Sequence, residues 1–477
     1  MEHHHRGQWG SNLGFLMATV GAAVGLGNIW SFPFRMGKNG GFAFLVIYLI
    51  LAVLVGFTIM LCELAIGRKG GGSVLHSYQR VTGKVGTFLG FLALLSPFLI
   101  LSFYTVLGAY CVQYVCLNFA ELLGIFSLSS VTGAESFGTM LTNQPLAIGS
   151  TFFFIAVCFL IIRGGIKEGI EKFNKVGMPA LFIMLLIVII RAVTLPGAVD
   201  GLKFMFAPNF EPIKTNFIGV LSAAGGQMFF SLSLAMGITV TYGSYLNKKE
   251  SLVKNSLLII VSDTIVAVLA GMAVLPAAFA LGGGEDAALS GPKLLFITLQ
   301  DVFNSMGAFG PIFGILFFLF VVLAAVTSAI ALTEVLVTFI IDLRTSKGKE
   351  PKRNTVVAIV CLIIFAEAAL VAADGLGSNG LWIPFHETGR NLGGTWLDFM
   401  DFISEGVAMP LGALIMSIVI GWFVGPKVIK EEVDLSGNQM SKGLYTFFNI
   451  CIRIVAPVAM AFILYGQVST FMAIPPQ

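Results

Sequence analysis

Polar side chains inside long apolar segments are the first candidates for chemistry in this chain. Asp263 lies 13 residues after Glu250, which corresponds to roughly 20 Å along a helix. A carboxylate at that depth in a membrane costs about 3 kcal/mol unless a cation compensates it. Asp263 therefore predicts a cation site, and the alternative is a protonated carboxyl that is hydrogen-bonded inside a helix bundle. Thr327 and Ser328 add adjacent hydroxyl groups, which either coordinate a cation or donate back to their own helix.

Two glycine-broken apolar segments would position these groups. The first runs from Val20 to Pro33 and contains three glycines and a proline, and the second runs from Gly225 to Gly237. Glycine and proline weaken a continuous helix, and unwound backbone persists at membrane depth only where it lines a cavity or binds a ligand. Paired interruptions in matching halves of a chain are typical of inverted-repeat transporters. The pattern predicts a binding site between the two breaks, near the membrane centre.

The composition indicates a membrane protein. The chain has 477 residues, of which 57% are apolar and 11% are charged, and its mean hydropathy is +0.91. A soluble protein has about a quarter charged residues, so we predict an all-α polytopic membrane protein. A spanning helix needs about 20 apolar residues, and eleven segments qualify. They lie near 12–36, 41–66, 87–120, 147–162, 170–195, 217–246, 251–281, 310–341, 355–373, 397–424 and 443–472.

The positive charges predict an orientation in the membrane. Most of the 28 Lys and Arg residues fall in loops on one side, at 68–84, 163–175, 248–254, 344–353 and 427–442. This asymmetry predicts a cytoplasmic N-terminus and an external C-terminus in the cell (plasma) membrane. The net charge of +3 then reports topology, and nucleic acid is not an expected partner. We expect no cleavable signal peptide, and we interpret His3 to His5 as the remnant of a tag.

Several motifs resemble one transporter family. The motif GLGNIW at 25–30, followed by Phe32-Pro33 and by NGGFAF at 39–44, resembles the first-helix signature of the neurotransmitter:sodium symporters. Further matches are QMFFSLS at 227–233 and the segment from 324 to 328. The resemblance implies the leucine-transporter fold, a 5+5 inverted repeat plus one extra helix, with 11 transmembrane helices in all. Residues 1–477 would form a single transporter domain, with spans 1–5 at 12–195, spans 6–10 at 217–424 and span 11 at 443–472.

The resemblance also implies ligand sets for one amino acid and two sodium ions. The first sodium ion would be held by the Ala23 carbonyl, by Asn28 and Ser231, and by a side chain of span 7, which we take to be Asp263. The second sodium ion would be held by the carbonyls of Gly21, Val24 and Ala324 and by the hydroxyls of Thr327 and Ser328. The residues expected around the amino acid are Ala23, Gly25, Leu26, Gly27, Ile100, Tyr104, Phe230, Ser231, Ser233, Ala235, Met236, Ala329 and Leu332.

The substrate class follows from Gly25, because amine-transporting relatives have an acid at this position. Without that acid the ligand would supply its own carboxylate, which would meet the N–H groups of Leu26 and Gly27, the first sodium ion and Tyr104. A buried core tyrosine is the alternative for Tyr104. The expected pocket is apolar, which favours a neutral amino acid with an apolar side chain. Ala235 stands where relatives often have glycine, and its methyl group should narrow the pocket or resist unwinding.

The resemblance also indicates two gates. At the cytoplasmic gate, Arg6 and Asp342 match an ion pair of the family, with Trp9 and Tyr245 nearby. At the outer gate, Ser31 replaces the usual arginine, whereas its acidic partner Asp401 remains. Either the outer gate is weaker, or another cation serves Asp401. Arg35 lies one turn beyond Ser31 and is the candidate cation, although a plain interface role is as compatible with the sequence.

Three further residues of the resemblance concern helix geometry. Glu63 is expected to bond the unwound backbone of span 1. Gly169 and Pro179, ten residues apart in span 5, either open a water path to the second sodium ion or simply kink the helix. Glu334, Glu367 and Glu405 receive no role.

These observations predict a sodium-coupled secondary active symporter of neutral amino acids that works by alternating access, with no enzymatic activity. Asp263 stands where family members commonly have asparagine and animal members use chloride nearby, so we expect no chloride requirement. The expected partners are a small amino acid and the lipid bilayer. The alternatives are a proton-coupled amino-acid transporter of the same fold, in which Asp263 titrates, and an amino-acid-binding membrane receptor or channel.

Overall fold

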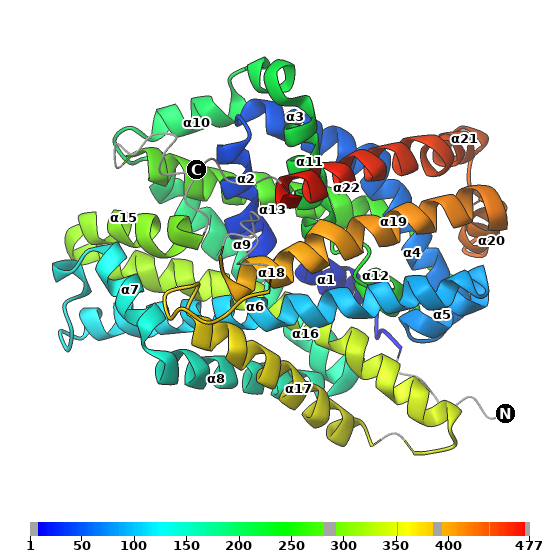
Figure 1. Cartoon of the computed structure of the whole chain (residues 1–477), viewed down its shortest axis with the longest axis horizontal. Coiled ribbons are helices and arrows are strands. Elements are labelled where there is room, and N and C mark those ends of the chain that lie inside the picture. The colour runs from blue at the N-terminus through cyan, green and yellow to red at the C-terminus, as the bar shows by residue number, and fades with distance from the viewer. Residues whose placement is uncertain (1–7, 281–291, 351, 385–393, 438, 473–477) are drawn as a thin grey trace.

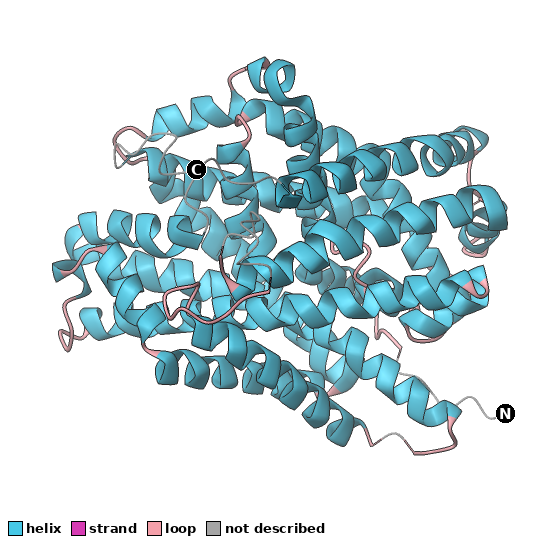
Figure 2. Cartoon of the chain, in the orientation of Figure 1, coloured by secondary structure: helices cyan, strands magenta, loops and turns pink. Residues whose placement is uncertain are grey.

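Helices account for the secondary structure of the described residues, which are 8–280, 292–350, 352–384, 394–437 and 439–472 of a computed structural model. Figure 2 shows that loops in this part of the chain serve as connections between helices. The prefix η below marks a short 3₁₀ or π-helical segment. The long apolar runs of the sequence explain this architecture, because a helix satisfies its backbone hydrogen bonds internally.

The first half of the chain supplies fourteen of the elements. They are α1 (Asn12–Ala23), η1 (Gly27–Ser31), α2 (Phe32–Lys38), α3 (Phe42–Leu51), η2 (Ala52–Gly56), α4 (Phe57–Gly70), α5 (Val74–Thr82), α6 (Val85–Leu122), η3 (Leu128–Ser130), α7 (Gly133–Thr142), α8 (Gln144–Ile162), η4 (Ile166–Glu171), α9 (Lys172–Val193) and α10 (Ala198–Phe206).

The second half continues in the same way. Its elements are α11 (Glu211–Ser231), α12 (Ile238–Gly243), α13 (Leu252–Ala280), η5 (Leu294–Thr298), α15 (Leu299–Ser305), η6 (Gly307–Phe309), α16 (Gly310–Ser346), α17 (Arg353–Asp374), α18 (Trp396–Asp401), η8 (Phe402–Ala408), α19 (Met409–Ile418), η9 (Val419–Val424), α20 (Lys427–Asp434), α21 (Lys442–Ile450), η10 (Cys451–Val455) and α22 (Ala456–Met472).

Within the described residues, nine helices are long and apolar enough to cross a membrane. The pair formed by Asn12–Ala23 and Gly27–Lys38 adds a tenth span that bends by 46° at its break. The predicted span at 217–246 is divided between α11 and α12 and does not meet the same test. Ten spans together with this divided segment are compatible with the predicted eleven.

The elements gather around two long central helices. In Figure 1, α6 and α16 run through the middle of the bundle, and they pack against each other. The short helices α5 and α20 lie at one end of the bundle (right in Figure 1), whereas α7 and α15 lie at the opposite end. A continuous core of buried apolar side chains joins these layers and encloses the two broken helices.

Both breaks lie inside the predicted segments, but the second occupies only the C-terminal part of its segment. Helix α1 ends at Ala23, two residues before Gly25. The pair Gly225-Gly226, which was expected to interrupt span 6, remains helical within α11, and the chain unwinds at 232–237 instead. A methyl group at Gly225 would lie 2.1 Å from Ile463 of α22, and one at Gly226 would lie 2.8 Å from the Arg35 guanidinium. These two glycines therefore permit close packing.

Candidate functional site

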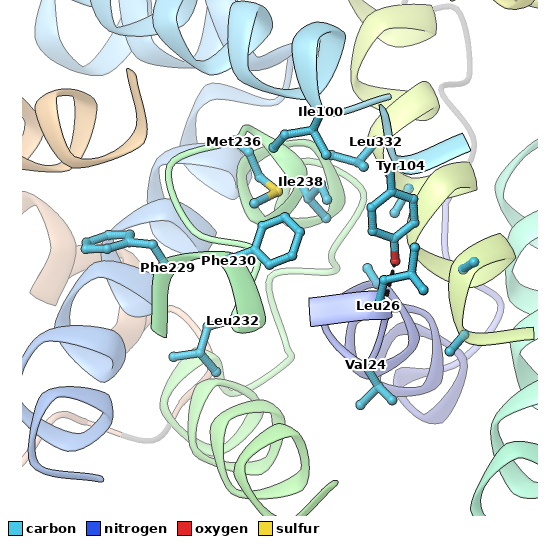
Figure 3. Close-up of a cluster of buried hydrophobic side chains, with 14 of the residues drawn as sticks. Val24, Leu26, Ile100, Tyr104, Phe229, Phe230, Leu232, Met236, Ile238 and Leu332 are labelled. Atoms are coloured by element: carbon cyan, nitrogen blue, oxygen red, sulfur yellow. Dashed lines mark hydrogen bonds between the residues drawn. The ribbon is translucent and has the colours of Figure 1, made fainter. Parts of the chain in front are cut away.

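The first break turns backbone groups toward Tyr104 of α6. A methyl group at Gly25 would lie 2.3 Å from both the Ser328 Oγ and the Tyr104 hydroxyl, so only glycine fits at this position. The N–H of Leu26 donates to the Tyr104 hydroxyl at 3.0 Å, as Figure 3 shows. The N–H of Gly25 donates to Oδ1 of Asn28 at 3.3 Å. The break thus presents the N-terminal end of the second half-helix to a buried polar site.

The second break contains residues in the left-handed conformation. Ser233 and Ala235 have φ angles of 53° and 59°, and Gly237 has 77°. Such angles are strained for residues other than glycine. The N–H of Ala235 is fixed by the fully buried carboxylate of Glu63 at 3.0 Å, and the Thr239 hydroxyl donates to the same carboxylate. The expectation that Glu63 bonds span 1 is therefore wrong, since it holds the unwound part of span 6.

A small cavity of about 20 Å³, enough for roughly one water molecule, lies between the two breaks and the central helices. Its lining residues are Ala22, Ala23, Gly25, Gly27, Ile100, Tyr104, Phe230, Ser233, Met236, Ile238, Ser328 and Leu332. This volume is far below the usual range of ligand pockets, so the lining side chains have to move apart to admit a ligand. Figure 3 shows that Phe230 points toward the side chains of Met236 and Ile238, whereas Phe229 points to the opposite side of its helix. Carbonyl, hydroxyl and apolar groups therefore line one space.

Nine of the thirteen residues predicted around the amino acid line this cavity. The other four lie beside it: Leu26 donates to Tyr104, Ser231 bonds to Asp263, Ala235 bonds to Glu63, and Ala329 is buried in α16. Sequence reasoning missed Ala22 and Ile238. Both flank a break, Ala22 at the end of α1 and Ile238 directly after Gly237, and that adjacency was an available signal.

The residues predicted for the first sodium ion share one hydrogen-bond network. Asp263 of α13 is fully buried, and its Oδ1 accepts from Nδ2 of Asn28 at 2.8 Å. Its Oδ2 accepts from the hydroxyls of Ser231 at 2.8 Å and of Tyr48 at 3.4 Å. The structure thereby brings together one side chain from each broken helix and the carboxylate of α13. Ala23, the fourth predicted ligand, ends α1 and lines the cavity. Sequence reasoning missed Tyr48.

The hydroxyls predicted for the second sodium ion donate to carbonyl groups. Thr327 Oγ1 donates to the Ala324 carbonyl of its own helix at 2.8 Å. Ser328 Oγ lies 3.3 Å from the same carbonyl and 3.0 Å from the Ala22 carbonyl across the interface with α1. Each hydroxyl oxygen keeps lone pairs that can face a cation. Gly21 within α1 and Val24, the residue directly after α1, are both buried.

Aromatic side chains lie on the side of the site that was predicted to face the cytoplasm. Trp9 donates from Nε1 to the Tyr242 carbonyl at 3.1 Å, and its ring meets the Tyr245 ring edge-on at 6.4 Å. The Tyr245 hydroxyl donates to the buried carboxylate of Glu334 at 3.2 Å. Asp342 accepts from the Ser73 N–H at 2.5 Å. Arg6, the predicted partner of Asp342, lies outside the described residues.

On the opposite side of the site, Arg35 pairs with a different acid from the predicted one. Its guanidinium forms an ion pair with Glu405 of η8, whose side chain is 4% exposed. Arg35 Nε also donates to the Ser31 hydroxyl at 3.0 Å, and Ser31 donates to the Gln227 amide of α11 at 2.7 Å. The direct ion pair of Arg35 is thus with Glu405, one turn beyond the predicted partner, whereas Asp401 shares a hydrogen bond with Glu405 and interacts electrostatically with Arg35. Through these two hydrogen bonds Ser31 connects Arg35 to α11, the first half of the second broken helix.

Two broken helices that face a buried polar cavity inside an all-helical membrane bundle define a secondary transporter of the leucine-transporter fold. The model of the sodium:neurotransmitter symporter family matches residues 6–127 and 125–475. The chain therefore belongs to this family, and it is a membrane transporter and not an enzyme.

Individual relatives agree with this assignment over nearly the full chain. An uncharacterized sodium-dependent transporter of Bacillus subtilis, YhdH, is 33% identical over 95% of this chain and 96% of its own length. Another uncharacterized sodium-dependent transporter, from Haemophilus influenzae, is 34% identical over 95% of this chain and 96% of its own. The crystal structure of MhsT in complex with L-phenylalanine has 33% identity and a TM-score of 0.85, with 97% of this chain and 100% of that chain covered.

Proposed function

We propose that the protein couples the uptake of a neutral amino acid with an apolar side chain to the entry of sodium, by alternating access. The observation that carries the proposal is the cavity between the two breaks, which has polar backbone at one end and apolar side chains at the other. The bound phenylalanine of MhsT supports the class of substrate. We place the N-terminus in the cytoplasm and the C-terminus outside.

The polar end suits the carboxylate and the ammonium of the substrate. The N–H groups of Leu26 and Gly27 begin the second half-helix and suit a carboxylate, together with the Tyr104 hydroxyl. The carbonyls at the end of α1 and the Ser233 hydroxyl suit an ammonium group. No acidic side chain is among the residues that line the described cavity, so a ligand with an amine alone would lack a counter-charge.

The apolar end suits the substrate side chain. Ile100, Phe230, Met236, Ile238 and Leu332 line it with carbon and sulfur atoms. A polar side chain placed there would lose its hydration without gaining partners, at a cost of about 1–3 kcal/mol. Met236 is flexible and can adapt to side chains of different shape. This lining supports transport of apolar amino acids as a class.

Asp263 supports sodium coupling without chloride. Its carboxylate lies within hydrogen-bond distance of Asn28 and Ser231, which supply oxygen ligands of the kind that hard cations prefer. A fixed negative charge next to the expected first sodium ion makes an external anion unnecessary. The second expected ion would sit between α1 and α16, where Ser328 joins the two helices. Movement of the broken helices against α6 and α16 would then open the cavity alternately to the two sides of the membrane.

A set of matched ligands tests the substrate assignment. We expect L-phenylalanine and L-leucine to bind the purified transporter in sodium and to stabilise it against heating. Phenethylamine, which lacks the carboxylate, and 3-phenylpropionate, which lacks the amine, should bind at least tenfold more weakly. Tighter binding of phenethylamine than of phenylalanine would contradict the proposed role of the first break.

A further inference from the structure

Arg453 of η10 is a charged residue on the lipid-facing surface of the last span. Ile450, three residues before it, and Ile454, directly after it, are about half exposed, at 49% and 57%. Trp422 and Phe423 at the end of the preceding span are 63% and 80% exposed. In a bilayer these apolar side chains contact lipid, so the guanidinium between them needs an anionic partner at this surface.

The contact between η9 and η10 is built to hold this guanidinium in place. Arg453 Nε donates to the Gly421 carbonyl at 2.8 Å, and its guanidinium carbon lies 5.6 Å from the centre of the Trp422 ring. Trp422 in turn donates from Nε1 to the Arg453 carbonyl at 3.1 Å. A methyl group at Gly421 would lie 3.2 Å from Cγ of Arg453, so the absence of a side chain there allows the close approach. A fixed guanidinium loses less conformational entropy when it binds an anion.

The remaining donors of Arg453 are unused within the described part of the chain. A guanidinium has five N–H donors, and of these the Nε–H has an acceptor there. The acids of the adjacent helix α20 are already paired: Glu431 lies 3.9 Å from Lys427, Glu432 lies 2.7 Å from Arg68, and Asp434 forms an ion pair with Lys430. The protein therefore does not neutralise Arg453 with these neighbours.

The position along the span identifies the anion. Gly421 lies in the last turn of the tenth span, which ends at Val424, and α20 follows at Lys427. The partner carbonyl of Arg453 therefore lies near the end of the bundle that carries α5 and α20, where the headgroups of one leaflet lie. A guanidinium pairs with two phosphate oxygens in a fork geometry. We propose that Arg453, Trp422 and the Gly421 carbonyl form a binding site for the phosphate of an anionic phospholipid, with its acyl chains along the exposed side chains of Ile454 and Val458.

Native mass spectrometry of the purified full-length transporter tests this site. The protein is mixed with equal amounts of phosphatidylglycerol and diacylglycerol of the same acyl chains, and the bound molecules are counted. We expect phosphatidylglycerol to be retained, and R453Q to lower its excess over diacylglycerol about fivefold, the effect of one basic residue at an anionic surface. R453K should fall between the two, because it keeps the charge and loses the fork.

R191Q is the matched control, because Arg191 lies in the last turn of α9 and lines a pocket with Phe303 of α15, at the end of the bundle opposite α20. It should retain phosphatidylglycerol as the wild type does. Equal retention by R453Q and wild type would overturn the proposal, and so would equal binding of diacylglycerol and phosphatidylglycerol by the wild type. Displacement of the lipid by millimolar inorganic phosphate would also overturn it, since the site would then bind free phosphate and not a lipid.

Tryptophan fluorescence gives a second readout that needs no change at Arg453. Phosphatidylglycerol with brominated acyl chains quenches a tryptophan that it touches. We expect it to quench Trp422 more strongly than brominated phosphatidylcholine does, and the difference should disappear in W422F. An equal quench by the two lipids in the wild type would contradict a site for an anionic headgroup.

Discussion

Asp263 carries the negative charge around which the polar side of the site is arranged. Three hydrogen-bond donors, from Asn28, Ser231 and Tyr48, converge on its two oxygens. These donors occupy acceptor positions on both carboxyl oxygens, which fixes the orientation of the side chain. The sequence predicted the buried acid from its depth, but Tyr48 lies 215 residues away and carried no signal.

Replacing Asp263 with asparagine tests the role of this charge. Wild-type uptake should be unchanged when chloride is replaced by gluconate. In D263N the sodium affinity should fall at least tenfold, the equivalent of about 1.4 kcal/mol, and chloride should restore part of it. Sodium-driven uptake at several chloride concentrations measures both effects. Strict chloride dependence of the wild type would contradict this account.

Ala235 stores backbone strain at the second break. Its φ of 59° costs an L-residue about 1–2 kcal/mol, which glycine avoids. We expect A235G to raise the melting temperature of the solubilised transporter. The control A223G lies in the regular helix α11 and should lower that temperature, because glycine destabilises a helix by about 0.5–1 kcal/mol. If both variants were destabilised equally, the left-handed conformation of Ala235 would be excluded.

At the scale of helices, the sequence predicted the two broken spans but not what every glycine does. The break after α1 coincides with Gly25, where a side chain has no room. In α11, by contrast, Gly225 and Gly226 are helical, and their lack of a side chain allows α22 and Arg35 to pack closely against the helix. Glycine signals both unwinding and close packing, and the sequence of one helix does not reveal its neighbour. For the same reason Glu63 and Glu405 could not be assigned their partners in advance.

The ion pair between Arg35 of α2 and Glu405 of η8 predicts that mutations of these two residues have non-additive effects on stability. R35A leaves the carboxylate of Glu405, which is 4% exposed, without its cation, and such a loss costs about 3–5 kcal/mol. The double variant R35A/E405A should therefore lose less stability than the sum of R35A and E405A. Melting temperatures of the four proteins measure this coupling. The pair R35A/E432A serves as the comparison and should be closer to additive, because Glu432 is also 4% exposed but pairs with Arg68; equal coupling in both pairs would exclude a specific pair of Arg35 with Glu405.

At the scale of the whole molecule, the composition and the paired breaks predicted a helical membrane protein with inverted repeats, and the resemblance of the GLGNIW motif predicted the leucine-transporter fold. The apolar runs require helices, and the interruptions locate the cavity between the two halves. The contacts that join the halves, such as Ser328 to the Ala22 carbonyl and Glu63 to Ala235, depend on distant segments. The two broken helices also contact each other directly, because the Ser233 hydroxyl donates to the Ala22 carbonyl at 3.1 Å and the Gln227 amide donates to the Gly27 carbonyl at 2.9 Å.

Accumulation of labelled L-phenylalanine in proteoliposomes tests the central claim most directly. With an inward sodium gradient and equal pH on both sides, we predict accumulation above the external concentration, and its loss when choline replaces sodium. Accumulation driven by an inward proton gradient in the absence of sodium would contradict sodium coupling and would identify Asp263 as a proton carrier.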